Sequence, residues 1–134
     1  MLAYFFDLTF SLNNELCDIV AAIGNHDEGT GVAISPVAAA LIIADKSDVR
    51  RSRVRNDDHS TFDIHDRVNY AVTSSSLTID DLHSQITLEL EIDTKISSVM
   101  EYFEIFLDRM LLCRRAADYF KMSFEVNING SRVM

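Results

Sequence analysis

The chain has 134 residues, a length typical of one domain with its own core, and we expect residues 1–134 to form a single α+β domain. Hydrophobic residues make up 48%, which excludes global disorder. The formal net charge of −9 opposes binding to nucleic acid or anionic lipid and favours a protein partner with a basic surface. The N-terminus lacks the basic region of a signal peptide, and the longest apolar run, 37–44, is too short to span a bilayer. We therefore expect a cytoplasmic protein outside the membrane.

The first elements are predicted to be a strand and an amphipathic helix. Residues 4–10 alternate with a period of two, which is typical of a strand whose polar side carries Asp7. Asn13 or Asn14 is expected to cap the following helix, which ends at Gly24. The apolar face of this helix is expected to be Leu16, Ile19, Val20 and Ile23.

The middle of the chain gives weaker signals. Residues 31–34 suggest a short strand, and Ser35-Pro36 is a good helix start before 37–44, which is apolar all round and so predicts a buried helix. A buried strand at 41–43 is the alternative. Residues 46–60 predict either a long mobile loop or two short irregular pieces. Residues 62–72 alternate and predict a strand with a bulge or a hairpin, followed by a turn at 73–76 and a short helical turn at 77–83.

The strongest pattern is a strand, a long helix and a second strand. Residues 86–92 and 122–128 alternate strictly, and the helix between them is expected to begin at Asp93 or Thr94. At roughly 40 Å this helix would exceed strands of about 23 Å, so it should overhang the sheet or break near residues 112–113. Its apolar end predicts a homodimer contact through the long helix. That end carries Leu107, Leu111 and Leu112.

These elements predict a ferredoxin-like, split β-α-β sandwich. It would have a mixed sheet of four or five strands, helices on one face, and a long C-terminal helix followed by a final strand. The open sheet face would be acidic, so either the strand with Glu89 and Glu91 lies apart from Glu125, or His65 and Arg67 lie beside the glutamates and offset their charge. We expect this face to bind a partner through Asp7, Glu89, Glu91 and Glu125.

Two other groups of residues could carry chemistry. His59, Asp63 and His65 are candidate ligands for zinc or manganese, or a general acid and base in phosphodiester cleavage, although no compact metal motif is present. A run of arginines is a candidate anion contact, with pairing inside the protein as the alternative. The run comprises Arg50, Arg51, Arg53 and Arg55.

No nucleotide-binding motif occurs, so no cofactor is predicted. Cys17 and Cys113 both fall on apolar helical stripes and are expected to be buried thiols. The sequence thus favours a small acidic protein-interaction module, an inhibitor or immunity-type binder of a basic protein surface, acting without catalysis. The alternatives are a metal- or histidine-dependent phosphodiesterase or nuclease using His59, Asp63 and His65, and a dimeric ligand-binding regulator.

Overall fold

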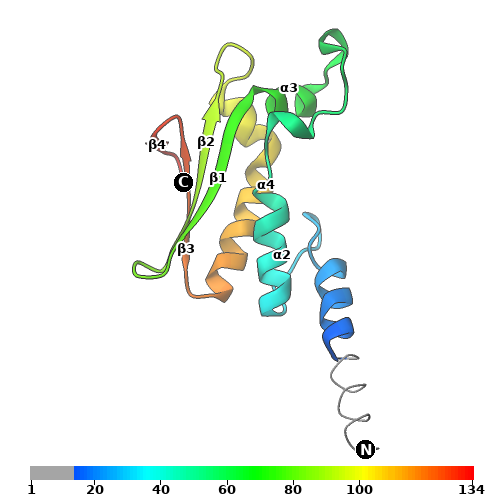
Figure 1. Ribbon diagram of the computed structural model, residues 1–134, viewed down its shortest axis with the longest axis vertical. Coiled ribbons are helices and arrows are strands. Elements are labelled where there is room, and N and C mark those ends of the chain that lie inside the picture. The colour runs from blue at the N-terminus through cyan, green and yellow to red at the C-terminus, as the bar shows by residue number, and fades with distance from the viewer. Residues whose placement is uncertain (1–13) are drawn as a thin grey trace, which may run out of the picture.

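The computed structural model describes residues 14–134 and shows an α+β domain with one sheet and helices on one of its faces (Figure 1). The strand expected at 4–10, with Asp7, lies outside the described residues. A first helix covers residues 14–24. It is followed by α2 (Pro36–Lys46), η1 (Arg51–Arg53), η2 (His59–Thr61), α3 (Ile64–Ala71), β1 (Val72–Asp80), β2 (Gln85–Ile92), α4 (Val99–Tyr119), β3 (Ser123–Ile128) and β4 (Ser131–Arg132).

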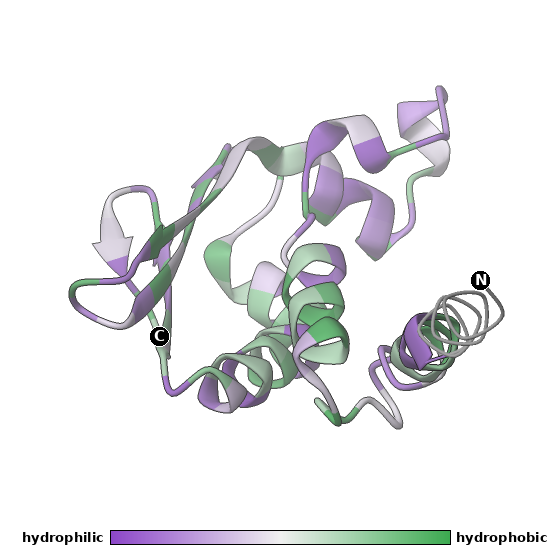
Figure 2. Ribbon diagram, turned by 60° about the horizontal axis from the view of Figure 1, so that its bottom comes forward, coloured by the Kyte–Doolittle hydropathy of each residue, from purple (hydrophilic) through white to green (hydrophobic). Residues whose placement is uncertain are grey.

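The strand–helix–strand unit is confirmed, and it forms the centre of the domain. β2 and β3 are parallel neighbours joined through α4, with Leu88 opposite Val126. In a split β-α-β unit another strand would lie between them, so the direct pairing corrects that part of the expected topology. The strand order is β1-β2-β3-β4, with antiparallel pairs at both edges. Figure 2 shows α2 and α4 packed on one side of this sheet.

The long helix starts later than predicted because a stronger cap follows Asp93 and Thr94. The Ser98 side chain accepts from the Glu101 amide, and the Glu101 carboxylate accepts from the Ser98 amide, which together form a capping box. With 21 residues α4 is about 32 Å long, close to the roughly 27 Å of the eight-residue β2. It neither breaks near residues 112–113 nor exceeds the sheet greatly. No helix within residues 14–134 is long and apolar enough to cross a membrane.

The strand predicted at 62–72 is wrong, because most of this stretch forms the helix α3. The Asp63 carboxylate accepts from the Asp66 amide and caps the helix. Val68 and Ala71 then turn into the core. Ile64 also packs there, and its four-residue spacing from Val68 fits both a helix and an alternating strand. The turn and helical turn predicted for 73–83 are also wrong, since residues 72–80 form β1, whose Ser/Thr-rich face is exposed. Pairing with β2 overrides the weak strand preference of the serines.

The helix α2 begins as predicted, with the Ser35 hydroxyl accepting from the Ala38 amide and Pro36 in the first turn. Only one side of α2 is buried, however, and it packs against α4 through Ala39, Ile42 and Ile43. The side expected to be buried but found exposed carries Val37, Ala40 and Ala44. The expected strand at 31–34 is an irregular segment.

An ion-pair network fastens the loop at 25–34 to both α2 and α4. Lys46 is only 5% exposed, and its ammonium lies 2.7 Å from the Asp45 carboxylate. Asp27 and Glu28 approach the same ammonium at 3.8 and 3.9 Å. Glu28 also pairs with Arg109 of α4 at 2.5 Å. The buried Lys46 thus contacts carboxylates of both α2 and the loop, and Glu28 links the loop to α4.

The loop also approaches α4 closely at Gly31. A β-carbon at this position would lie 2.5 Å from the Asp27 carbonyl oxygen and 2.9 Å from a methyl carbon of Leu112. Leu112 is buried beneath the loop. The loop can therefore cover α4 only because residue 31 has no side chain.

We predict that Gly31→Ala lowers the free energy of unfolding by about 1–3 kcal/mol, because the backbone and Leu112 must shift to admit the methyl group. The matched control is Gly29→Ala, since nothing lies within 4 Å of a β-carbon there. That variant should be neutral or stabilising by up to about 1 kcal/mol. Urea unfolding followed by circular dichroism measures both. Equal losses in the two variants would contradict the close approach at Gly31.

We predict that Asp45→Asn destabilises the protein by about 1–3 kcal/mol near neutral pH, because the buried Lys46 loses its nearest charged partner. Burial pushes the pKa of Asp45 upward, but the hydrogen bond and charge of Lys46, with His26 and Arg53, outweigh it and hold the pKa below its usual 3.8. The stabilisation is therefore present above the unfolded-state pKa and is lost as the pH falls through the folded-state pKa.

The difference in stability between wild type and Asp45→Asn should accordingly be constant between about pH 5 and 7 and shrink at acid pH. Urea titrations across this range measure it, with Glu104→Gln as a control for an exposed carboxylate. A difference that grows as the pH falls would show that the lysine–aspartate pair is not the cause.

Candidate functional site

The open face of the sheet gathers three of the predicted partner-binding residues. Glu89, Glu91 and Glu125 alternate with buried neighbours on β2 and β3, so all three project from the side away from α4. Glu89 lies opposite Ser76 on one side and Asn127 on the other, and Glu125 lies opposite Thr87. The register therefore staggers the carboxylates, and no two of these glutamates are directly opposite.

Two of these carboxylates are held in place by neighbours on the same face. The Asn127 amide donates to Glu89 Oε1 at 2.6 Å, and the Arg132 guanidinium pairs with Glu125 Oε1 at 2.8 Å. Glu91 is exposed, opposite Ser74. The result is a surface with two held carboxylates and one exposed carboxylate among short hydroxyl side chains.

The expectation that His65 and Arg67 would offset these glutamates is wrong. Both residues belong to α3 and not to the sheet, and Arg67 pairs with Glu101 at the start of α4. Arg132 of β4 takes the compensating role instead. The sequence alone does not show this, because β4 has only two residues and no alternating pattern.

The arginine run is engaged largely within the protein. Asp48 pairs with both Arg50 and Arg53, at 2.8 and 3.0 Å. Arg51 donates to the Tyr70 carbonyl oxygen at 2.7 Å, and its guanidinium stacks 4.3 Å from the centre of the Tyr70 ring. Within residues 14–134 no ion pair involves Arg55. Most of the predicted anion contact thus serves to position η1, one of two short 3₁₀ helices in the segment 46–61.

His59, Asp63 and His65 do not converge on a common point. The His59 ring packs against Phe62 and Tyr70, with centroids 4.9 and 4.5 Å away. Asp63 uses its carboxylate to cap α3, and the expected strand face shared with His65 does not exist. Throughout residues 14–134, no group of three or more His, Cys, Asp or Glu side chains is arranged to hold a metal ion.

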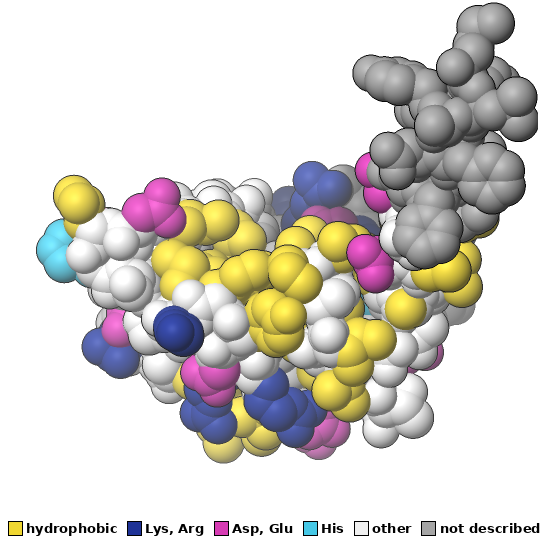
Figure 3. Space-filling model, turned by 90° about the horizontal axis from the view of Figure 1, so that it is seen from below, with side chains coloured by type: hydrophobic (Ala, Val, Ile, Leu, Met, Phe, Trp, Pro, Cys, Tyr) yellow, Lys and Arg dark blue, Asp and Glu magenta, His cyan; other side chains and the backbone are white. Residues whose placement is uncertain are grey.

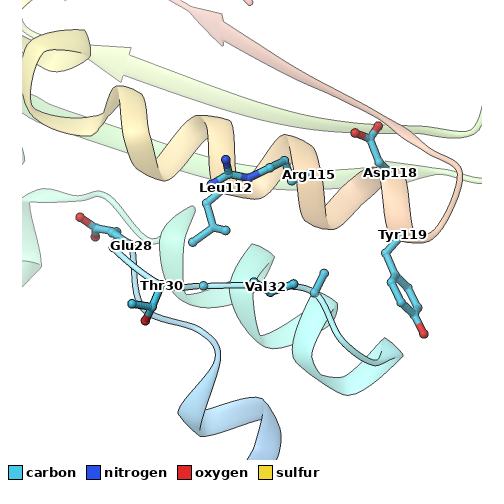
Figure 4. Close-up of a pocket in the computed structure, with 10 residues that line it drawn as sticks. Glu28, Thr30, Val32, Leu112, Arg115, Asp118 and Tyr119 are labelled. Atoms are coloured by element: carbon cyan, nitrogen blue, oxygen red, sulfur yellow. The ribbon is translucent and has the colours of Figure 1, made fainter.

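A hollow of about 650 Å³ lies between the loop at 28–33 and the C-terminal half of α4 (Figure 4). The loop contributes Glu28, Thr30 and Val32, and α4 contributes mainly exposed side chains. Glu28 is already engaged by Arg109, and the remaining charged side chains, Arg115 and Asp118, have opposite signs. The charges in the lining therefore favour no single class of ligand.

The two cysteines differ in their surroundings. Cys113 is buried, and burial raises the pKa of its thiol to about 12, which leaves it a poor nucleophile at neutral pH. Cys17 is exposed on the first helix, so the expectation that it is buried is wrong. Its helix presents to solvent the apolar stripe that the sequence pattern assigned to the core.

An apolar groove that the sequence did not predict runs between α2 and the end of β1. Two adjoining hollows of about 400 and 660 Å³ share Ala40, Ala44 and Phe120 in their lining. Figure 3 shows hydrophobic side chains gathered over this end of the molecule. We refer to this surface as the apolar groove. Its lining also includes one charged residue, Asp81, and the apolar residues Pro36, Val37, Leu41, Ile43, Leu77, Ile79, Ile86 and Met122.

The leucines of the predicted homodimer contact lie at different depths on α4. Leu107 is exposed, but Leu112 is buried beneath the chain's own loop next to Gly31. The larger continuous apolar surface is the groove, which α4 borders only at its C-terminal end.

Comparison with known proteins does not bear on these surfaces. No protein-family model, curated protein or solved structure matches it. No similar solved structure therefore supports the prediction of a ferredoxin-like sandwich. Any functional assignment depends on the geometry described above.

Proposed function

We propose that this protein is a protein-interaction module of the inhibitor or immunity type, acting without catalysis through the acidic face of its sheet on a basic protein surface. The observation that carries the proposal is that Glu89, Glu91 and Glu125 share one sheet face that no helix within residues 14–134 covers. The net charge of −9 adds a long-range attraction toward a basic partner.

The local arrangement supports binding with little reorganisation. Asn127 and Arg132 hold Glu89 and Glu125, so these carboxylates lose less conformational entropy when a partner docks. The neighbouring side chains on β1 are Ser74, Ser76 and Thr78, which are short and exposed. Long basic side chains of a partner could therefore reach Glu89 and Glu91, whereas the Glu125 side chain is only 15% exposed and already pairs with Arg132. A row of spaced carboxylates of this kind resembles the charge pattern of a nucleic-acid backbone.

The phosphodiesterase alternative gains no support from the described residues. A general acid and base must lie within reach of a common substrate atom. The His59 ring instead lies against Phe62 and Tyr70, and the Asp63 carboxylate caps a helix. The hollow between the loop at 28–33 and α4 gives no support to the ligand-binding regulator either, because its lining carries charges of both signs.

We predict that Glu89→Lys/Glu91→Lys weakens partner binding by more than about tenfold, because two attractive contacts become repulsive. The partner is first captured from the source cells on immobilised wild-type protein and identified by mass spectrometry. Its dissociation constant is then measured by calorimetry at low and high salt. Binding by the wild type should weaken as salt rises, since exposed charges are screened.

The matched control is Glu104→Lys/Asp108→Lys, which makes the same change in charge at two exposed positions of α4. It should weaken binding much less than the sheet-face variant. Equal effects would mean that net charge alone attracts the partner, and unaffected binding in the sheet-face variant would exclude this face. His59→Ala/His65→Ala should bind normally, and loss of activity in that variant with folding unchanged would favour the enzyme.

A further inference from the structure

The outer edge of β1 carries backbone groups that lack a partner within residues 14–134. β1 pairs with β2 on one side only and stands at the end of the strand order (Figure 1). In that part of the chain, the backbone of residues 73–80 forms no hydrogen bond outside the β1–β2 ladder. In an antiparallel edge strand, every second residue points its N–H and C=O away from the sheet. These groups can bind one kind of partner, an extended strand.

β1 lacks the features that usually prevent an edge strand from pairing, namely short length, proline and charge. The strand at the other edge, β4, has only two residues, whereas β1 has nine. Residues 72–79 include no proline and no charged residue, although 25% of the chain is charged. The one irregularity of β1 lies at its beginning, between Val72 and Ser74. Most of β1 can therefore accept another strand without burying a charge.

The charges at the two ends of β1 favour an antiparallel pair of identical strands. Before its first residue, the exposed Arg51 donates to the Tyr70 carbonyl oxygen at 2.7 Å. At its other end Asp80 and Asp81 are both exposed, and Asp80 pairs with the His83 ring at 2.6 Å. An antiparallel second copy would bring its acidic end toward Arg51, and the same contact would recur at the opposite end. A parallel copy would place like charges side by side.

The glutamates of the sheet do not oppose such a pair strongly. Glu89 and Glu91 lie on β2, one strand away from the edge, and their neighbours on β1 are Ser76 and Ser74. If two β1 strands pair, the two β2 strands are three strand spacings apart, roughly 14 Å. This distance exceeds the Debye length of about 8 Å at physiological ionic strength. The uncharged β1 strands thus separate the acidic strands of the two copies.

The side chains of β1 also favour the contact on the helix side of the sheet. Leu77 and Ile79 lie opposite Leu88 and Ile86 of β2, so all four project toward the helices. Ile79 is nevertheless 63% exposed, because no strand lies beyond it within residues 14–134. A second β1 would cover part of this apolar surface with its own Leu77 and Ile79.

We propose that two copies of this chain form a dimer by antiparallel pairing of their β1 strands, which joins the two sheets into one. The contact is the same for both copies and closes under a twofold axis perpendicular to the sheet. The acidic faces of both copies then lie on the same side of the joined sheet. The contact uses the edge of the sheet and not its acidic face, so the inference is independent of the proposed function.

The first test is molar mass, measured by light scattering during gel filtration at about 100 µM, where a micromolar contact is populated. The wild type should have twice the 15.1 kDa mass of the chain. Ser76→Lys should be monomeric, because a dimer would bring two lysines together near its axis. Its fold should persist, since Ser76 lies opposite Glu89. The matched control, Ser131→Lys on the opposite edge strand, should remain a dimer.

Exchanging charges tests the antiparallel orientation. Arg51→Glu and Asp81→Arg should each weaken the dimer by about tenfold, because each reverses the charge contact at both ends. An equimolar mixture of the two variants should regain wild-type affinity, since in the heterodimer both contacts again join opposite charges. Circular dichroism of each variant checks that the fold is unchanged. A mixture that dimerises no better than the separate variants would overturn the antiparallel pairing.

Hydrogen exchange identifies the occupant of the edge. Amides of residues 73–80 should exchange more slowly as the protein concentration rises, because dimerisation protects them. Residues 4–10, whose alternation predicts a strand, are the competing occupant. Protection of β1 that is independent of concentration in a monomeric wild type would assign the edge to them and overturn the proposal. A dimer that persists in Ser76→Lys, or a monomer whose β1 amides are unprotected, would overturn it as well.

Discussion

The ammonium group of Lys46 is the constraint on which the arrangement of the helices depends. A charge withdrawn from water in this way is tolerated only when carboxylates surround it, and Asp45, Asp27 and Glu28 do so. Since Asp27 and Glu28 belong to a loop, the need to neutralise the lysine holds that loop on the body of the protein. The extension from Glu28 to Arg109 then fixes the loop relative to α4. The orientation of the first helix follows from where this loop begins.

The acidic surface has a different origin, in the alternation of β2 and β3. The core takes every second residue of these strands, which leaves the glutamates on the opposite face. A shift of either strand by one residue would place carboxylates against α4, so the apolar core and the position of the charges are specified together. The surface proposed to bind a partner is in this sense a consequence of how the core is packed.

The elements predicted correctly are those whose pattern fits one structure only. The strict alternation at 86–92 and 122–128, and the Ser35-Pro36 start of α2, have a single reading. In contrast, the spacing of Ile64, Val68 and Val72 fits both a strand and a helix. The helix cap made by the Asp63 carboxylate favours the helix. The Ser98–Glu101 capping box was readable from the sequence and would have placed the start of α4 correctly.

Features that depend on distant partners could not be read from local patterns. Glu89, Glu91 and Glu125 were placed on one face by alternation, but the pairing of Glu125 with Arg132 requires the turn after β3. The burial of Lys46 has no local signal, because it lies at the edge of a charged run. The groove was missed because α2 is apolar on all sides, and composition does not reveal which side lacks a covering layer.

The unequal surroundings of the two thiols have a practical consequence. Cys113 is enclosed in the core with a raised pKa, while Cys17 faces solvent on the first helix. A maleimide dye applied to the native protein at neutral pH would therefore attach at one site. The chain thus carries a natural labelling position on its first helix, and a fluorophore can be placed there without introducing a cysteine by mutagenesis.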